Sequence, residues 1–181
     1  MHEASERHEQ VASGEKLVPV SAAVVAVLAA LATLFAHHSS TSALAQKNEA
    51  ILYQAKAADQ YNYFESKRIK AELNQSLIDS GVVAGGSAGH QAMMRRINKE
   101  KTEADVILKK AKALEAQSGD YSERSERFMN SYENHEIAAT LFEVSIVLVS
   151  ITALMRTRAL LWIAGSATLV GFAFFAVGLM H

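Results

Sequence analysis

The sequence predicts an all-α integral membrane protein with three transmembrane helices and a long antiparallel, coiled-coil-like helical hairpin between the first and second spans. Three observations predict this fold. Three apolar runs are each long enough to cross a bilayer. A charged insert with a glycine-rich centre separates the first run from the other two. The 181 residues include a single proline, so most of the chain is free to be helical.

The composition excludes several classes of function. Between His37 and Glu136 the acidic and basic residues balance, so the chain lacks the excess of Lys and Arg that nucleic acid requires. The absence of cysteine excludes disulfides, thiolate metal sites and cysteine nucleophiles. No Ser-His-Asp order, pair of catalytic carboxylates or nucleotide-binding loop stands out. We therefore expect no catalytic residue, no cofactor and no nucleic-acid partner.

The N-terminal part predicts a polar tail followed by the first span. Residues 1–16 alternate Glu, His, Ser and Arg without an apolar period. Residues 17–36 carry no charge and, at about 1.5 Å per residue, span the roughly 30 Å hydrocarbon core. Pro19 falls in the first turn of this run, where its missing N–H costs nothing. A cleaved signal peptide is the competing interpretation, but the acidic tail and the length of the run favour an uncleaved anchor.

Residues 37–136 are predicted to form the hairpin domain. Its arms cover about 39–80 and 90–136, and the glycine-rich tip at 81–89 turns the chain. By the helical rise the hairpin is about 60 to 70 Å long. The tip lacks the Lys-Ser or Lys-Thr pair that would follow Gly86 in a phosphate-binding loop, so we interpret it as a turn.

Both arms carry an apolar stripe at three- and four-residue steps, the period of a helix that packs along one face. The first stripe is thin, so it must pack against a partner, and the second has the spacing of an antiparallel coiled coil. Gly119 is predicted to kink or break the second arm. The first stripe is Leu44, Ile51, Ala55, Ala58, Asn62, Ile69, Leu73 and Leu77; the second is Met93, Ile97, Ala104, Leu108, Ala111, Leu114, Tyr121, Phe128 and Tyr132.

Residues 137–155 and 159–180 are predicted to be the second and third transmembrane helices. The connection Arg156-Thr157-Arg158 is too short to be anything but a turn between antiparallel helices. Because basic residues next to a span stay on the cytoplasmic side, we expect a cytoplasmic N-terminus and an extracytoplasmic hairpin.

Short motifs near the three spans resemble a known family, the bacterial three-span membrane proteins catalogued as domain of unknown function 4337. The chain departs from its pattern at Ala50, where the family commonly has tryptophan, and at Glu143, where it has glutamine. The resemblance implies the fold and a multi-pass protein of the bacterial inner (plasma) membrane, and it implies no activity. It rests on Leu44-Ala45, Tyr53-Gln54-Ala55-Lys56, Leu141-Phe142-Glu143, Arg156-Thr157-Arg158 and Leu161-Trp162.

Glu143 is the one charged residue within the second span. By the helical rise it lies about 9 Å below the start of that span, deep enough to feel the bilayer. An intramembrane acid suggests an ion or proton role, although one acid makes a pathway only if several copies form a ring. The alternative is a glutamate that hydrogen-bonds a neighbouring helix, for instance at Ser21 or Thr33.

A group of histidines lies at the predicted membrane surface. His37 and His38 end the first span, and His135 and Glu136 begin the second. Imidazole and carboxylate ligands are suited to zinc. Neighbouring residues on a helix point about 100° apart, however, and histidines are an ordinary way to end a span. We therefore expect no metal site, and keep these four residues as candidates.

An aromatic patch accompanies the family-like motif on the first arm. Its helical spacing favours packing in a core or an oligomer over a ligand pocket. The patch consists of Tyr53, Tyr61, Tyr63 and Phe64, beside Gln54 and Lys56.

The function that these features favour is structural. Because a two-helix hairpin buries little apolar surface by itself, lateral packing is needed to order it. We therefore expect a membrane-anchored protein that self-associates as a homo-oligomer or docks an unidentified protein partner. The alternative is a homo-oligomeric channel or ion-translocating protein with Glu143 facing the bundle interior.

Overall fold

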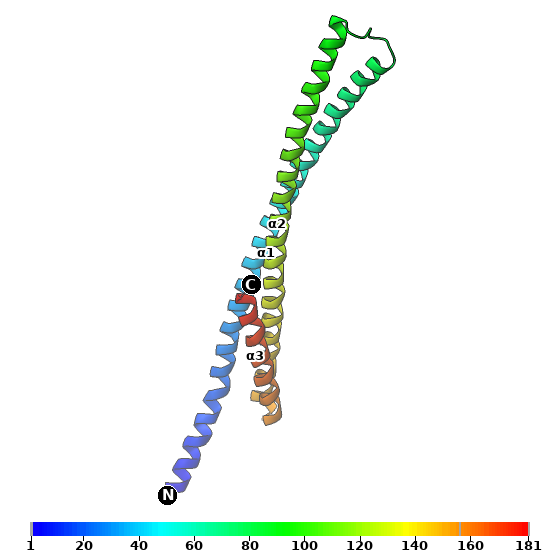
Figure 1. The fold of residues 1–181 in the computed structure, drawn as a ribbon. Coiled ribbons are helices and arrows are strands. Elements are labelled where there is room, and N and C mark those ends of the chain that lie inside the picture. Colours follow the sequence, from blue (N-terminus) through cyan, green and yellow to red (C-terminus); the bar gives the residue numbers. More distant parts are fainter. Residues whose placement is uncertain (1, 156, 181) are drawn as a thin grey trace. The chain divides into compact units, whose positions relative to one another are not determined.

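The computed structural model consists of three helices, and no strand occurs among the residues it describes, 2–155 and 157–180. The helices are α1 (His2–Asp79), α2 (Ala88–Met155) and α3 (Arg158–Leu179) (Figure 1). All three are long and apolar enough to cross a membrane. Side chains are described for residues 18–152, 154, 155, 157 and 159–180, so those of the predicted tail and of the Arg156 and Arg158 turn lie outside the described residues.

Two helix boundaries differ from the sequence-based expectation. Because α1 already begins at His2, Pro19 lies inside the helix and not in its first turn. The break expected at Gly119 is also wrong, since α2 continues through it. A glycine within a helix costs only about 1 kcal/mol. The neighbouring Ser118 is buried and donates a 2.8 Å hydrogen bond from Oγ to the carbonyl oxygen of Ala50, which ties α2 to α1 at this point.

The connection between α1 and α2 depends on glycine. Gly81 and Gly86 both have a φ of 75°, in the left-handed region that side chains with a Cβ atom disfavour. The Oγ atom of Ser87 then accepts a 3.1 Å hydrogen bond from the backbone N–H of His90, which caps the start of α2. The connection between the two helices therefore covers residues 80–87.

The chain divides into two compact units. Unit 1 comprises Met1–Leu44 and Ser125–His181, and unit 2 comprises Ala45–Arg124. Unit 2 thus contains the α1–α2 turn together with the adjoining parts of both helices, and it lies within the predicted hairpin domain.

In unit 2, α1 and α2 pack mainly through small buried residues that are spaced by seven or fourteen positions. The contact partners run in opposite directions: Ala50 meets Ser118, and Lys67, farther along α1, meets Glu103, earlier in α2. Small side chains let two helices approach closely. The buried positions are Ala50, Ala57 and Ala71 on α1 and Ile97, Ala104, Ala111 and Ser118 on α2.

The two predicted stripes fare differently. On α2, Ile97, Ala104 and Ala111 are buried as expected, whereas Phe128 is exposed. On α1 the predicted stripe does not face α2, and the side chains of Ile51 and Leu73 are 60% and 61% exposed. The face that meets α2 is the alanine face one position earlier in the sequence.

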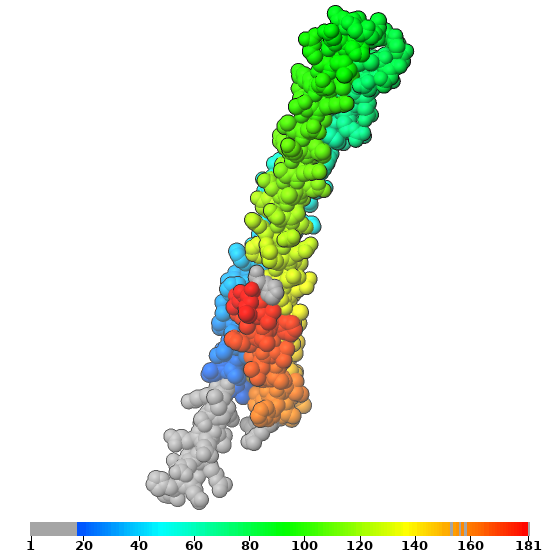
Figure 2. Space-filling model, viewed as in Figure 1, coloured from blue at the N-terminus to red at the C-terminus, as the bar shows by residue number. Residues whose placement is uncertain are grey.

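Unit 1 has an apolar core contributed by all three helices. Phe142 of α2 is fully buried at its centre, and Phe174 and Phe175 of α3 pack against it. Space-filling atoms of α3, orange to red in Figure 2, cover one side of this unit. Ser145 donates a 3.2 Å hydrogen bond to the carbonyl oxygen of Ala164, which links α2 to α3. The remaining buried core residues are Val25, Ala29, Ala32, Ala138 and Ala139.

Candidate functional site

The family-like motif Tyr53-Gln54-Ala55-Lys56 holds α1 against α2 in unit 2. The Tyr53 ring stacks on that of Tyr121, with centroids 5.3 Å apart and planes 13° from parallel. Lys56 Nζ lies 4.8 Å from the Tyr53 centroid, and the guanidinium of Arg124 lies 5.6 Å from that of Tyr121. Each tyrosine therefore has a cation near its ring, an arrangement that stabilises a packed aromatic pair. Gln54 is exposed.

The rest of the aromatic patch also serves helix packing. Tyr61 donates a 2.6 Å hydrogen bond to the Glu115 carboxylate of α2, and this bond raises the pKa of the phenol. Phe64 lies under the guanidinium of Arg68, at 5.9 Å, and Tyr63 is half exposed. Tyr53 and Tyr61 thus contact side chains of α2, whereas Phe64 contacts Arg68 of α1 itself.

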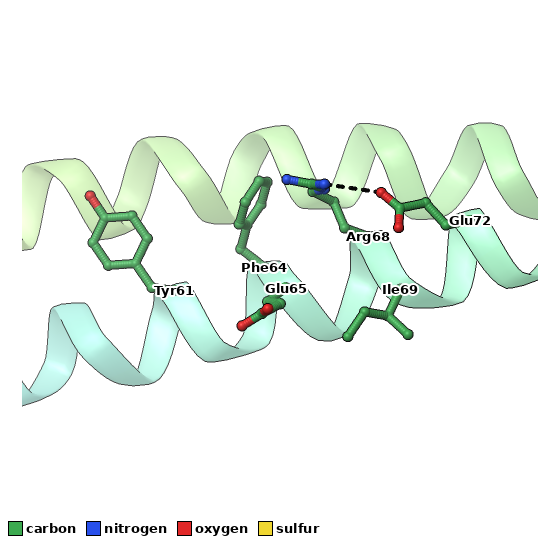
Figure 3. Close-up of a pocket in the computed structure, with 6 residues that line it drawn as sticks. All are labelled: Tyr61, Phe64, Glu65, Arg68, Ile69 and Glu72. Atoms are coloured by element: carbon green, nitrogen blue, oxygen red, sulfur yellow. Dashed lines mark hydrogen bonds and ion pairs between the residues drawn. The ribbon is translucent and has the colours of Figure 1, made fainter.

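A shallow pocket of about 280 Å³ lies along this part of α1. Its lining comes entirely from α1 (Figure 3). In that view Tyr61, Phe64 and Arg68 point toward α2, whereas Glu65 and Ile69 lie on the other side of α1. Arg68 is already paired with Glu72 at 3.0 Å, so its charge is compensated. The pocket brings together no nucleophile and base, and we assign it no chemistry.

A charged cluster at Lys67 was missed by sequence reasoning. Lys67 Nζ contacts the carboxylates of Glu100 at 2.9 Å and Glu103 at 2.6 Å. Hydrogen bonding to these carboxylates raises the pKa of Lys67 and lowers that of Glu103. The lysine is mostly buried, since its side chain is 12% exposed. The signal in the sequence was weak, because the partners lie on different helices and register decides the pairing.

Glu143 does not face the interior of the three-helix bundle of a single chain. Its side chain is exposed, and neither expected partner bonds to it: Ser21 donates to the carbonyl oxygen of Val18, and Thr33 to that of Ala29. The face of α2 that meets the other helices is occupied by residues such as Phe142 and Ser145. The Glu143 carboxylate therefore lies on the surface of unit 1.

A polar groove of about 410 Å³ lies between α1 and α2 in unit 1 and includes Glu143. Hydrogen bonding to Glu136 raises the pKa of the Tyr132 phenol. All ion pairs found among the described side chains lie in unit 2, so neither Glu136 nor Glu143 has a paired cation there. The groove is lined by Thr33, Ala36, His37, Ser40, Tyr132, Glu136, Ala139, Thr140 and Glu143.

The four metal candidates are not brought together. His37 and Glu136 line the groove, and His38 is exposed outside it. His135 is instead buried, with its ring stacked on Phe35 at 5.6 Å. Among the described residues no group of three or more His, Asp or Glu is arranged to hold a metal ion.

A buried polar cluster ties α3 to the other two helices. Ser131 of α2 donates a 2.8 Å hydrogen bond from Oγ to the carbonyl oxygen of Gly178 and lies 3.2 Å from the Oγ atom of Ser39 on α1. His135 Nδ1 lies 2.7 Å from the carbonyl oxygen of Ser131. Sequence reasoning kept His135 only as a candidate metal ligand and overlooked the four-residue spacing from Ser131, which puts both side chains on one face.

Comparison with protein families gives one match. The family model described as Domain of unknown function (DUF4337) matches residues 15–181. The chain belongs to this family. The DUF4337 match covers α1 from residue 15 onward, all of α2 and α3, the Tyr53-to-Lys56 motif and Glu143. Neither the curated proteins nor the solved structures gave a match to this DUF4337 chain.

Proposed function

We propose that the protein is a membrane-anchored interaction protein without enzymatic activity. Residues 17–36, 137–155 and 159–180 span the bacterial inner membrane, and residues 37–136 form an antiparallel helical hairpin outside it. The arginine-flanked turn near Thr157 favours a cytoplasmic N-terminus. The hairpin serves to associate with another protein, first of all with further copies of the chain.

The observation that carries this proposal is the exposed apolar face of α1 in unit 2. Ile51, Ile69 and Leu73 are 56% to 61% exposed there, in the segment that this proposal places outside the membrane. Each such side chain contributes about 1.5 to 3 kcal/mol when it is fully buried. Rows of exposed apolar side chains are typical of protein interaction sites.

The mass of the particle in nanodiscs, measured by native mass spectrometry, tests the proposal. We expect an integer multiple of the chain mass, or a stable complex with a second protein from the native membrane. A strictly monomeric particle that also gives no crosslinked product in native membranes would contradict it.

A second candidate function is ion translocation, and the exposure of Glu143 supports it. In an oligomer this carboxylate and Glu136 would line a shared polar surface, as rings of acids do in cation channels. Proteoliposome flux distinguishes the two functions. Cation flux that Glu143→Gln abolishes supports a channel, whereas flux no greater than that of empty liposomes leaves the interaction function alone.

A further inference from the structure

Alpha-helix α1 has a second regular face besides the one that meets α2. Counting in alternating steps of three and four gives a row of positions that are all exposed in unit 2. We call this row the outer seam; in unit 2 it consists of Asn48, Ile51, Ala55, Ala58 and Asn62. The same count leads back into unit 1, where Val20, Ala23, Val27, Ala30, Leu34, His37, Thr41 and Leu44 are likewise exposed.

The spacing of the outer seam is that of a coiled coil. Steps of three and four repeat every seven residues, which keeps one face of a helix against a partner helix. Alanine at Ala55 and Ala58 allows close approach, and Ile51 is 60% exposed and supplies the apolar contact. Because the outer seam lies on a different face of α1 from the buried alanine face that meets α2, α1 can contact α2 and a partner at the same time.

The chemistry of the outer seam fits a second copy of this chain. From Val20 to Asn62 no seam position is Asp, Glu, Lys or Arg, so identical copies would bring no like charges together. Asn48 and Asn62 each carry a donor and an acceptor, so each can pair with its own counterpart. Asparagine within a coiled-coil seam fixes register in this way.

Membrane anchoring fixes the direction of the pair, and this step rests on the proposed function. Copies held in one bilayer with one topology have their α1 helices parallel, so the seam residues of one copy face the same residues of the other. The next seam positions are Glu65, Ile69 and Glu72, and the two glutamates would then bring like charges together, which ends the close contact at Asn62.

The seam thus combines positions without Asp, Glu, Lys or Arg, asparagines that can pair with their own counterparts, and a parallel direction set by the membrane anchoring. We infer that two copies associate through parallel, in-register contact of their α1 outer seams.

The cysteine-free chain allows a direct test by single-cysteine crosslinking. A disulfide needs Cβ atoms about 3.5 to 4.5 Å apart, so crosslinking reports register. Full-length Ile51→Cys and Ala58→Cys variants are oxidised in nanodiscs, with Ala113→Cys as the control because Ala113 is exposed on α2. We expect the two seam variants to form covalent dimers at least about tenfold faster than the control.

A mixed sample tests register itself. Tagged Ile51→Cys chains are combined with untagged Ala58→Cys chains, whose cysteines differ by about 10 Å along the helix. The inference predicts self-crosslinks and almost no mixed crosslink. Mixed crosslinks that equal the self-crosslinks, or no seam crosslink in a particle of multiple mass, overturn the parallel seam while self-association stands. A monomeric particle without crosslinks would contradict both the parallel seam and self-association.

Discussion

Gly178 of α3 lies directly against the ring of His135 on α2. A Cβ atom on Gly178 would lie 2.8 Å from Cε1 and 3.0 Å from Nδ1 of this buried ring. The ring is held by Phe35 and Phe175, with centroids 5.6 and 5.3 Å away, so it has little room to move. The closeness of α3 to α2 therefore depends on the absence of a side chain at Gly178.

Gly178→Ala is expected to destabilise unit 1 by about 1 to 3 kcal/mol, the usual cost of overpacking a core. Gly165→Ala is the matched control on the same helix, because nothing lies within 4 Å of its added Cβ atom. Thermal unfolding in detergent, followed by circular dichroism, checks the difference. Equal midpoints for both variants would show that α3 does not pack as described.

Ala57→Leu is expected to weaken the contact between α1 and α2 in unit 2. Ala57 is 1% exposed, and a larger side chain would force the two helices apart at a cost of about 1 to 3 kcal/mol. Ala113→Leu, at an exposed position of α2, should change stability by less than about 0.5 kcal/mol. Hydrogen exchange of unit 2 amides compares them, and faster exchange only in Ala57→Leu is the expected result.

Acidification is expected to destabilise unit 2 through the Lys67 cluster. The hydrogen bond from Lys67 lowers the pKa of Glu103, so this pairing stabilises the fold above the ordinary carboxyl pKa of 4.5 and is lost as the pH falls through the lower folded value. The raised pKa of Lys67 has the opposite sign: its contribution is present below 10.5 and is lost as the pH rises through the folded value.

Lys67→Met removes the cation from this cluster and provides the check. The variant should no longer lose stability between pH 5 and pH 3 through this pair, because protonation then relieves repulsion between Glu100 and Glu103. Glu123→Gln, which changes an exposed acid outside the cluster, should keep the wild-type pH dependence. Melting midpoints of all three proteins across this pH range decide, and three parallel curves would refute the role of Lys67.

Ile51→Glu is expected to separate copies of the chain without unfolding it. The substitution sets like charges opposite each other on the outer seam and should weaken association at least about tenfold. Val106→Glu is the control, because Val106 is 64% exposed on α2 and outside the seam. Sedimentation in detergent measures the association of both variants. Equal weakening of association by the two substitutions would contradict association through the outer seam.

The sequence predicts the helices better than it predicts their faces. Apolar runs, one proline and a glycine-rich turn were sufficient for an all-helical chain with three helices able to span a membrane. On α1, however, the period of Ile51 and Leu73 is shared by the row that contains Ala50 and Ala57. The larger apolar side chains of the first row suggest that this row faces α2. The small side chains of the second row allow closer packing, and they are the ones buried against α2.

The residues of the candidate site were harder to place for a related reason. Tyr53 was singled out as part of a motif, but its partner Tyr121 lies on the other helix and only the register reveals the stack. Glu143 was identified from its charge alone, and its exposure depends on the face that Phe142 takes up in the core. A sequence shows which side chains are charged or aromatic, whereas the direction in which each side chain points follows from packing between helices.

The mass of the nanodisc-embedded particle tests the central claim most directly. Native mass spectrometry is applied to the wild type and to Glu143→Gln, both at concentrations low enough to exclude chance co-embedding. Self-association predicts a wild-type particle with two or more copies, and a change in copy number for Glu143→Gln would place this carboxylate at the contact between copies. A single copy in every particle would contradict the claim.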